Sequence, residues 1–222
     1  MNAHELGLDY YKIYDVVDHR VEHWVTLQGQ FDEEPERAEL LLMSHFANPA
    51  SKIPEEKVDS NAHLSWYWLY QPMPEPMRVV VVETAPGVVT KLVIGRPVAL
   101  LAPAQKKERG SRFPKERDHF KVYRVLRGEP MQDVVELEDQ FGSEPAEILY
   151  PVAFGVPVQK EYKGEVSPIY NDRAHLLIQR IVPRPVQQSK IVRDQFGRRY
   201  VSFLQSVGLA VPCVKHKWQE LE

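Results

Sequence analysis

The chain has 222 residues, 43% hydrophobic and 27% charged, which is enough for one large or two small hydrophobic cores. Its formal net charge of -3 excludes the broadly basic surface of a nonspecific nucleic-acid binder, so we expect no nucleic-acid partner. No apolar run reaches the ~20 residues of a membrane-spanning helix, and the first residues do not resemble a signal peptide. The single cysteine, Cys213, excludes an intramolecular disulfide, so we expect a cytoplasmic protein. A secreted protein whose leader has been removed is the alternative.

Several short sequence elements recur about 109 residues further along the chain. Residues 9–12 (DYYK) recur as 118–121 (DHFK), and residues 49–52 (PASK) recur as 157–160 (PVQK). Agreement of several such landmarks along the full length predicts that the chain is a twofold duplication.

Each half divides once more into two similar units. In the second half, residues 138–142 (EDQFG) recur as 193–197 (RDQFG), and residues 156–160 (VPVQK) recur as 211–215 (VPCVK). The chain is therefore expected to consist of four units of roughly 50 residues. Each unit ends in a Pro-x-x-Lys motif, and the lysines of these motifs are Lys52, Lys106, Lys160 and Lys215.

The hydrophobic period within a unit is that of a β-strand. Residues 121–126 and 135–138 are mostly β-branched or aromatic residues in alternation with polar ones. The Asp-Gln-Phe-Gly segments between such runs are typical of hairpin turns, with the phenylalanine folded back on the core. Pro97 and Pro151 interrupt the third run of a unit, where we expect an edge strand or a bulge. One short helix is expected over 35–41, where a proline and acidic residues precede an apolar run.

These patterns predict an all-β protein made of two tandem, repeat-related domains, each a β-sandwich or closed barrel built from two units of roughly 50 residues. Residues 1–107 form the first, more diverged domain, and residues 115–222 form the second. The charged segment 108–114 is the predicted linker between them.

The motifs DHFKVY (118–123) and AHL (174–176), the two DQFG turns and the VPVQK and VPCVK ends resemble a family of bacterial repeat proteins of unknown function. The resemblance is clearer in the second half of the chain than in the first. It implies an all-β repeat architecture and no known activity. Many members of that family look secreted and carry cysteines beside the Lys-x-Tyr and Pro-x-x-Lys positions. This chain has Val122 and Gly155 at such places and keeps only Cys213.

The four Pro-x-x-Lys lysines are candidate ligand-binding residues. If pseudo-symmetry brought Lys52, Lys106, Lys160 and Lys215 together on one axis, their ammonium groups would form a site for an anion or a carboxylate. In the other arrangement each lysine protects an edge strand or covers apolar surface. We expect the second arrangement.

Aromatic residues gather in the first half of the chain. Trp66, Trp68 and Tyr70 share one face of a predicted strand, because side chains alternate between the faces of a strand. A flat aromatic row of this kind could bind a sugar, another small ligand or a protein. Packing in the core or between the domains is the simpler expectation.

Known catalytic and metal-binding motifs are missing from the sequence. It contains no HExxH, CxxC, Gly-x-Ser-x-Gly or phosphate-binding Gly-rich loop, so we expect no catalytic residue, no metal and no cofactor. His19 and His23 are four residues apart, but ordinary hydrogen-bonded histidines are expected there. One enzyme hypothesis stays open, in which Asp118, Lys160 and His175 form a site between the halves.

Repeated β modules without catalytic spacings predict a non-catalytic structural or protein-binding protein, self-associating or part of a larger assembly. The alternative is a carbohydrate-binding or small-ligand-binding module that uses the aromatic row. An enzyme with an interdomain site is the third hypothesis.

Overall fold

The computed structural model describes residues 3–18, 20–53, 55, 57–70 and 74–221. These residues form α1 (Ala3–Leu6), β1 (Tyr10–Val17), β2 (Arg20–Gly29), β3 (Glu36–Lys52), β4 (His63–Tyr70), β5 (Arg78–Ala85), β6 (Val88–Lys106), β7 (His119–Arg127), β8 (Asp133–Asp139), β9 (Gly142–Tyr162), β10 (Glu165–Ser167), β11 (His175–Asp194) and β12 (Gly197–Glu220). The all-β prediction is confirmed. Within the described ranges, no helix is long and apolar enough to cross a membrane.

The short helix expected over 35–41 is wrong, because this segment begins the long strand β3. Ala38 and Leu40 are fully buried, whereas Arg37 and Glu39, which alternate with them, are more exposed. A burial period of two residues belongs to a strand and not to a helix. Pairing with β2 and β4 on the two sides of β3 therefore overrides the local helix signal.

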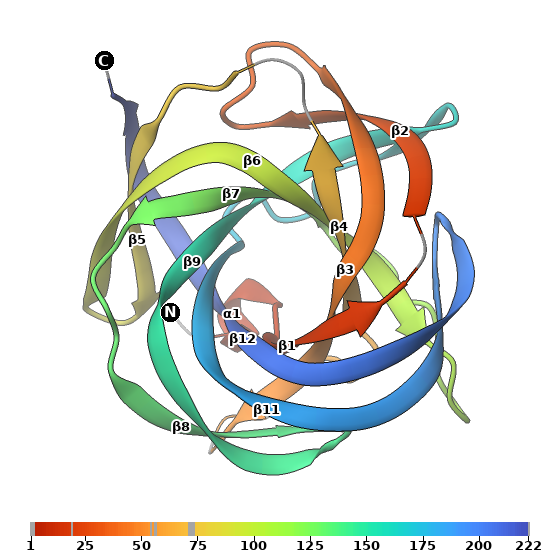
Figure 1. Ribbon diagram of the computed structural model, residues 1–222. Coiled ribbons are helices and arrows are strands. Elements are labelled where there is room, and N and C mark those ends of the chain that lie inside the picture. The colour runs from red at the N-terminus through yellow and green to blue at the C-terminus, as the bar shows by residue number, and fades with distance from the viewer. Residues whose placement is uncertain (1–2, 19, 54, 56, 71–73, 222) are drawn as a thin grey trace.

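Eight of the strands close into a barrel. Each pairs with the next in the order β1, β3, β4, β6, β7, β9, β11 and β12, and β12 pairs back with β1. All of these pairings are antiparallel. Figure 1 looks along the barrel axis, with α1 seen inside the ring of strands. Closure leaves the ring without an unpaired edge strand, so the ring has no exposed backbone edge that could pair with another chain.

Each of the four units supplies two ring strands and extends them into a hairpin outside the ring. The outer strand of each hairpin pairs with the end of the last strand of the unit two places away along the chain. These outer pairings join β2 to β9, β5 to β12, β8 to β3 and the end of β11 to β6. The units are therefore interlocked and do not simply lie side by side.

The two predicted domains share one sheet. Strand β6 of the first half pairs with β7 of the second, and β12 pairs back with β1. The predicted linker, 108–114, lies in the irregular connection between β6 and β7. The two halves complete a single barrel between them, and folding of either half as a separate domain stays a prediction.

Side chains alternate between the inside and the outside of the barrel. On β4, Leu64 and Trp66 belong to the inner core, whereas Tyr67 and Leu69 belong to an outer core beneath the hairpins. Further outer clusters include residues of the β5–β6 and β8–β9 hairpins. Both faces of the ring strands are thus covered, which explains why these strands contain long, nearly continuous apolar runs.

The predicted hairpin turns and proline irregularities are present. Gly142 and Gly197 have φ angles of 128° and 140°, a backbone region that favours glycine. Phe196 folds back into the outer core, as expected for the Asp-Gln-Phe-Gly turns. The pairing of β6 with β7 shifts register on both sides of Pro97, and the pairing of β9 with β11 shifts beside Pro151. Both prolines therefore lie at bulges within long strands.

Candidate functional site

A cavity of about 410 Å³, here called the lumen pocket, opens at one end of the barrel. All eight ring strands contribute to its wall, from Ile13 on β1 to Gly208 on β12. Leu6 and Leu8, at the end of α1 and just after it, pack into the inner core with Phe120 and fill the barrel interior beyond the pocket. The lumen pocket is therefore a cup with one open end.

The predicted aromatic row contributes two of its three members to this pocket. Trp66 and Trp68 line the wall, whereas Tyr70 is not part of it. The exposed fractions of the three residues are 6%, 39% and 54%, so the row runs outward from the inner core to solvent. Trp66 and Trp68 were predicted to share one face of a strand, and both line the pocket wall. The prediction did not include that this face lies inside a barrel.

Positive charge surrounds the mouth of the lumen pocket. Arg96, Arg124 and Arg180 line it, and the imidazole of His45 lies beside them. Arg96 and Arg124 form no hydrogen bond or ion pair with another residue in the described part of the chain. An apolar wall with cationic groups at its rim is suited to a ligand that is apolar at one end and anionic at the other.

The carboxylate of Asp15 partly offsets this positive charge. Asp15 Oδ1 lies 3.1 Å from His45 Nε2, and Gln205 Nε2 donates to Asp15 Oδ2 at 2.8 Å. The hydrogen bond from His45 lowers the pKa of Asp15, with smaller contributions from Gln205 and from the charge of Arg180. Asp15 therefore stays ionised and balances part of the charge of Arg180, which leaves Arg96 and Arg124 as the less balanced cations at the mouth.

The repeat explains how these residues come to face one another. One position is equivalent in the first ring strand of all four units. It is occupied by Asp15 on β1, Trp68 on β4, Arg124 on β7 and Arg180 on β11. In a pseudo-symmetric barrel, equivalent positions lie at the same depth around the axis. Three residues at this repeat position, Trp68, Arg124 and Arg180, line the pocket, and His45 and Arg96 join them from the second ring strands of their units. The sequence signal that could have identified both arginines is their spacing from the repeated histidine: Arg124 lies five residues after His119, and Arg180 lies five residues after His175.

The four predicted lysines do not converge on an axis, because Lys52, Lys106, Lys160 and Lys215 pair with four different strands, β8, β11, β2 and β5 in turn. The surroundings of each lysine are here called a corner and are numbered by the unit to which the lysine belongs. At the third corner, Lys160 donates to Gln195 Oε1, and Gln195 Nε2 donates to His119 Nε2 at 2.7 Å. The Phe196 ring lies 5.9 Å from the lysine Nζ. The lysine and the histidine belong to the third unit, whereas Gln195 and Phe196 belong to the turn of the fourth. The bridge therefore joins neighbouring units.

The fourth corner repeats this bridge and the first lacks it. Lys215 donates to Gln30 Oε1, Gln30 donates to His175 Nε2, and the Phe31 ring lies 4.7 Å from the Lys215 Nζ. At the first corner Lys52 instead lies 5.9 Å from the ring of Tyr10, which occupies the histidine position. Lys160 and Lys215 thus fasten one unit to the next, a role that neither hypothesis for the lysines includes.

The residues of the enzyme hypothesis are each engaged elsewhere. Asp118 accepts hydrogen bonds from the backbone N–H groups of Tyr170 (2.6 Å) and Asn171 (3.1 Å), which holds the loop before β11. Lys160 and His175 belong to the bridges of two different corners. Asp118 therefore acts as the turn-closing residue that its position before a strand suggests.

A buried ionic cluster was not predicted from the sequence. Lys121 Nζ lies 2.8 Å from Asp32, 2.9 Å from Glu36 and 2.7 Å from Glu75. The three carboxylates have the mutual spacing of a possible metal site, but the Lys121 ammonium lies among them. Burial lowers the pKa of Lys121, and the charges of Asp32 and Glu75 outweigh this effect and raise it above its usual value. The lysine thus takes the place that a cation would need.

Among the histidines whose side chains the structure describes, His216 is exposed and the others are partly or fully buried. His23 Nδ1 lies 3.1 Å from the Tyr162 hydroxyl, and its ring stacks on Phe196. His19, its partner in the predicted four-residue spacing, lies outside the described residues. The expectation of no metal and no cofactor stays a prediction.

The fold and the lumen pocket define a class of protein, an all-β repeat protein whose four units close into one barrel around a cavity. The family model described as "Repeat of unknown function (DUF7450)" matches residues 63–212. The match covers more than half of the 222-residue chain, so the chain belongs to this repeat family, and the resemblance noted in the sequence is confirmed. No curated protein and no solved structure was found to match it.

Proposed function

We propose that the protein binds a small amphipathic anion in the lumen pocket. The observation that carries the proposal is a cavity of about 410 Å³ that joins an apolar wall to three arginines at its mouth. This volume lies in the range of sites for small organic ligands, roughly 300–1,000 Å³. The apolar part of the ligand packs against Trp66, Ile178 and Val207, and its acidic group meets the arginines.

Arginine is suited to this task because its planar guanidinium can bind a carboxylate or a phosphate through two parallel hydrogen bonds. Arg124 has no competing ion pair among the described residues, so binding at this side breaks no existing interaction. The charge of Arg180 is partly balanced by the nearby carboxylate of Asp15. We therefore assign the acidic head of the ligand to Arg124 first and to Arg180 second.

The composition of the wall supports an anion more than a sugar. Carbohydrate sites need acceptors such as carboxylates and side-chain amides for the sugar hydroxyls. The lining residues in the described part of the chain include neither group. Trp66 is almost fully buried, so the aromatic row offers less flat exposed surface than the sequence suggested. A structural or protein-binding role, alone or within an assembly, stays a prediction.

Tryptophan fluorescence titrated with decanoate tests the proposal. Trp66 and Trp68 line the lumen pocket, whereas Trp24 and Trp218 do not. Decanoate is expected to give a saturable change in emission at pH 7. Decyltrimethylammonium has the same tail with a positive head and is expected to bind at least ~10-fold more weakly, which corresponds to about 1.4 kcal/mol.

Two variants separate head recognition from tail burial. Arg124→Gln combined with Arg180→Gln should weaken decanoate binding at least ~10-fold through loss of charge-assisted hydrogen bonds. Val152→Trp should abolish it by filling the cavity. Arg37→Gln is the matched control, because Arg37 stacks on Trp24 outside the lumen pocket. Equal binding of the two detergents, or full affinity in the double arginine variant, would refute the proposal and favour a structural or protein-binding role.

A further inference from the structure

The corner at the end of the second unit departs from the bridge seen at the third and fourth corners. Here Gln140 Nε2 donates to Asn48 Oδ1 at 3.0 Å instead of joining the lysine to the histidine. Asn48 precedes the proline of its Pro-x-x-Lys motif. The other units have apolar residues at that position: Ala102, Val156 and Val211. A competing amide thus draws the glutamine away at this corner.

Lys106 is left as a buried ammonium without a hydrogen-bond acceptor in the part of the chain that the structure describes. The carboxylate of Glu108 lies 3.8 Å from its Nζ, beyond hydrogen-bond length, and only 2.9 Å from the Nζ of Lys190. The Phe141 ring covers one side of the ammonium at 4.3 Å. A buried charge with unsatisfied donors is costly, so an acceptor that reached it would be held firmly.

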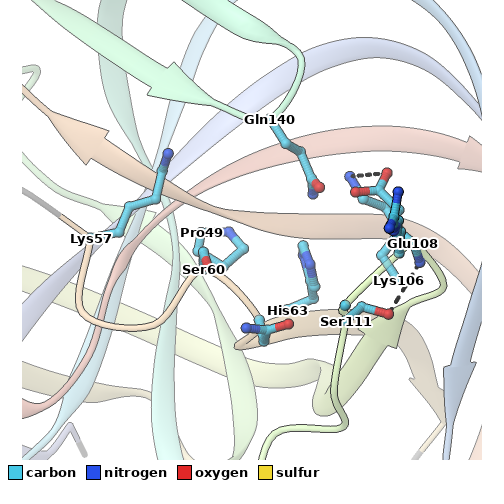
Figure 2. Close-up of a pocket in the computed structure, with 11 residues that line it drawn as sticks. Pro49, Lys57, Ser60, His63, Lys106, Glu108, Ser111 and Gln140 are labelled. Atoms are coloured by element: carbon cyan, nitrogen blue, oxygen red, sulfur yellow. Dashed lines mark hydrogen bonds and ion pairs between the residues drawn. The ribbon is translucent and has the colours of Figure 1, made fainter.

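Lys106 borders a polar pocket of about 250 Å³, here called the corner pocket. Figure 2 shows the His63 ring between Lys57 on one side of the pocket and Lys106 on the other. Lys57 and Arg109 add positive charge to the rim, and Glu108, which Lys190 neutralises, is the carboxylate among the described lining residues. The local potential therefore favours an anion.

Ser111 provides a second donor in the corner pocket. Its Oγ accepts hydrogen bonds from the backbone N–H of Glu108 and from Gln105 Nε2, both at 3.1 Å. The hydroxyl proton of Ser111 is not used in either bond and remains available for a ligand. These two bonds also fix the position of the oxygen, so the donor is already in place.

We propose that the corner pocket binds a small oxyanion, a phosphate or carboxylate group, through the Lys106 ammonium and the Ser111 hydroxyl. The site shares no lining residue with the lumen pocket and does not depend on the function proposed for it. The third corner, where Gln195 already supplies an oxygen to Lys160, is its filled counterpart. The oxyanion takes the position that the glutamine oxygen takes there.

The protonation state of Lys106 gives the site a pH dependence. Burial lowers the pKa of this lysine to about 8, so the ammonium is the main form at pH 7 and is lost toward pH 9. Burial also lowers the pKa of His63 to about 3, so His63 stays neutral over this range. The other charged groups that face the corner pocket or Lys106 are Asp139 on β8, Lys190 on β11, and Lys57, Glu108 and Arg109 in the adjoining segments.

Isothermal titration calorimetry with inorganic phosphate, and separately with acetate, tests the proposal. The wild-type protein is expected to bind phosphate with one-to-one stoichiometry at pH 7. Its affinity should fall by pH 9, although phosphate itself becomes more negative, because the ammonium is lost. Lys106→Met should weaken binding at least ~10-fold through loss of a charged donor. The acetate series distinguishes a carboxylate site from one that requires phosphate.

Three variants control the experiment. Lys160→Met removes the equivalent lysine of the filled corner and should leave phosphate binding unchanged, as should the double Arg124→Gln, Arg180→Gln variant of the lumen pocket. Asn48→Val should release Gln140 to bond Lys106 and so weaken phosphate binding. Because Lys106→Met removes an unsatisfied buried charge, its urea midpoint should rise, which separates lost binding from unfolding. Absence of phosphate and acetate binding by the wild type, or equal binding by Lys106→Met, overturns the proposal.

Discussion

Replacement of Lys121 by methionine is expected to destabilise the protein strongly. The Lys121 side chain is fully buried, and so, almost entirely, are the side chains of Asp32 and Glu75 that it contacts. Methionine has a similar length and apolar stem, so the change removes the charge with little change in packed volume. Two buried carboxylates then lose an ammonium partner at once.

The magnitude follows from the cost of leaving buried charge uncompensated. Breaking a buried ion pair by removing one partner costs about 3–5 kcal/mol. Arg78 remains 2.7 Å from Glu75, so the lower part of that range is expected. In a protein of this size, each kcal/mol shifts the melting temperature by about 2–4 °C, which gives a decrease of roughly 6–15 °C. Urea unfolding followed by tryptophan fluorescence measures the free energy directly.

Lys12→Met is the matched control, because Lys12 occupies the same repeat position as Lys121. Among the described residues, the Lys12 ammonium pairs with a single carboxylate, that of Glu144, which is partly open to solvent. Loss of one charged hydrogen bond of this kind costs about 1.5 kcal/mol. Equal urea midpoints for Lys121→Met and the wild type, or an equal loss in the two variants, would refute the reasoning.

Acid should partly rescue the Lys121→Met variant. Burial already raises the pKa of Asp32, with the Lys121 charge acting in the opposite direction. Without the ammonium the folded-state pKa of Asp32 rises further above its unfolded value. The penalty is therefore full well above that pKa and shrinks as the pH falls toward it. The difference in unfolding free energy between variant and wild type should be smaller at pH 5 than at pH 8.

Three further predictions concern pH and packing. Burial lowers the pKa of His63 to about 3 and of His175 to about 4, and that of His119 well below its usual value, so the unfolded state alone takes up these protons as the pH falls below ~6.5. Each histidine should cost about 1.4 kcal/mol at pH 5.5 relative to pH 8, and His63→Gln should reduce the drop in urea stability by that amount. Tyr67→Phe removes a buried hydroxyl that donates a hydrogen bond to Asp194, and it should lower the free energy of unfolding by about 1.5–3 kcal/mol in the same assay. An unchanged free energy of unfolding would contradict this hydrogen bond. Leu100→Ala, at a fully buried position, should lower stability by about 2–5 kcal/mol, and a change below 1 kcal/mol would show that the outer core is loosely packed there.

The units and their strands could be predicted from the sequence because both signals are local. The alternation of residues 121–126 and the glycines of the Asp-Gln-Phe-Gly turns specify strands and hairpins whatever surrounds them. Closure of the ring could not be predicted, because it depends on pairings such as β1 with β12, which join opposite ends of the chain. The helix prediction for 35–41 was wrong for the same reason, because pairing with β2 and β4 decides the conformation of this segment.

The candidate sites could be predicted only in part. Trp66 and Trp68 were placed on one face by strand periodicity, but nothing in that period states whether the face points into a barrel or toward solvent. The lysines were recognised as a repeated set, yet their partners come from the next unit's turn, so Gln195 and Gln30 were not connected with them. A repeat gives equivalent positions, whereas the contact between units depends on how the units are arranged.

Differences between equivalent positions explain where this barrel can bind ligands. Tyr14, Tyr67 and Tyr123 occupy one repeat position and are all buried, so this position serves packing in three units alike. The next residue along these strands is Asp15, Trp68 or Arg124, and Trp68 and Arg124 line the lumen pocket. The corner pocket arises in the same way, because one asparagine, Asn48, diverts a glutamine that closes the equivalent corners. In a closed repeat, a ligand site is therefore expected where one unit departs from a contact that its siblings satisfy internally.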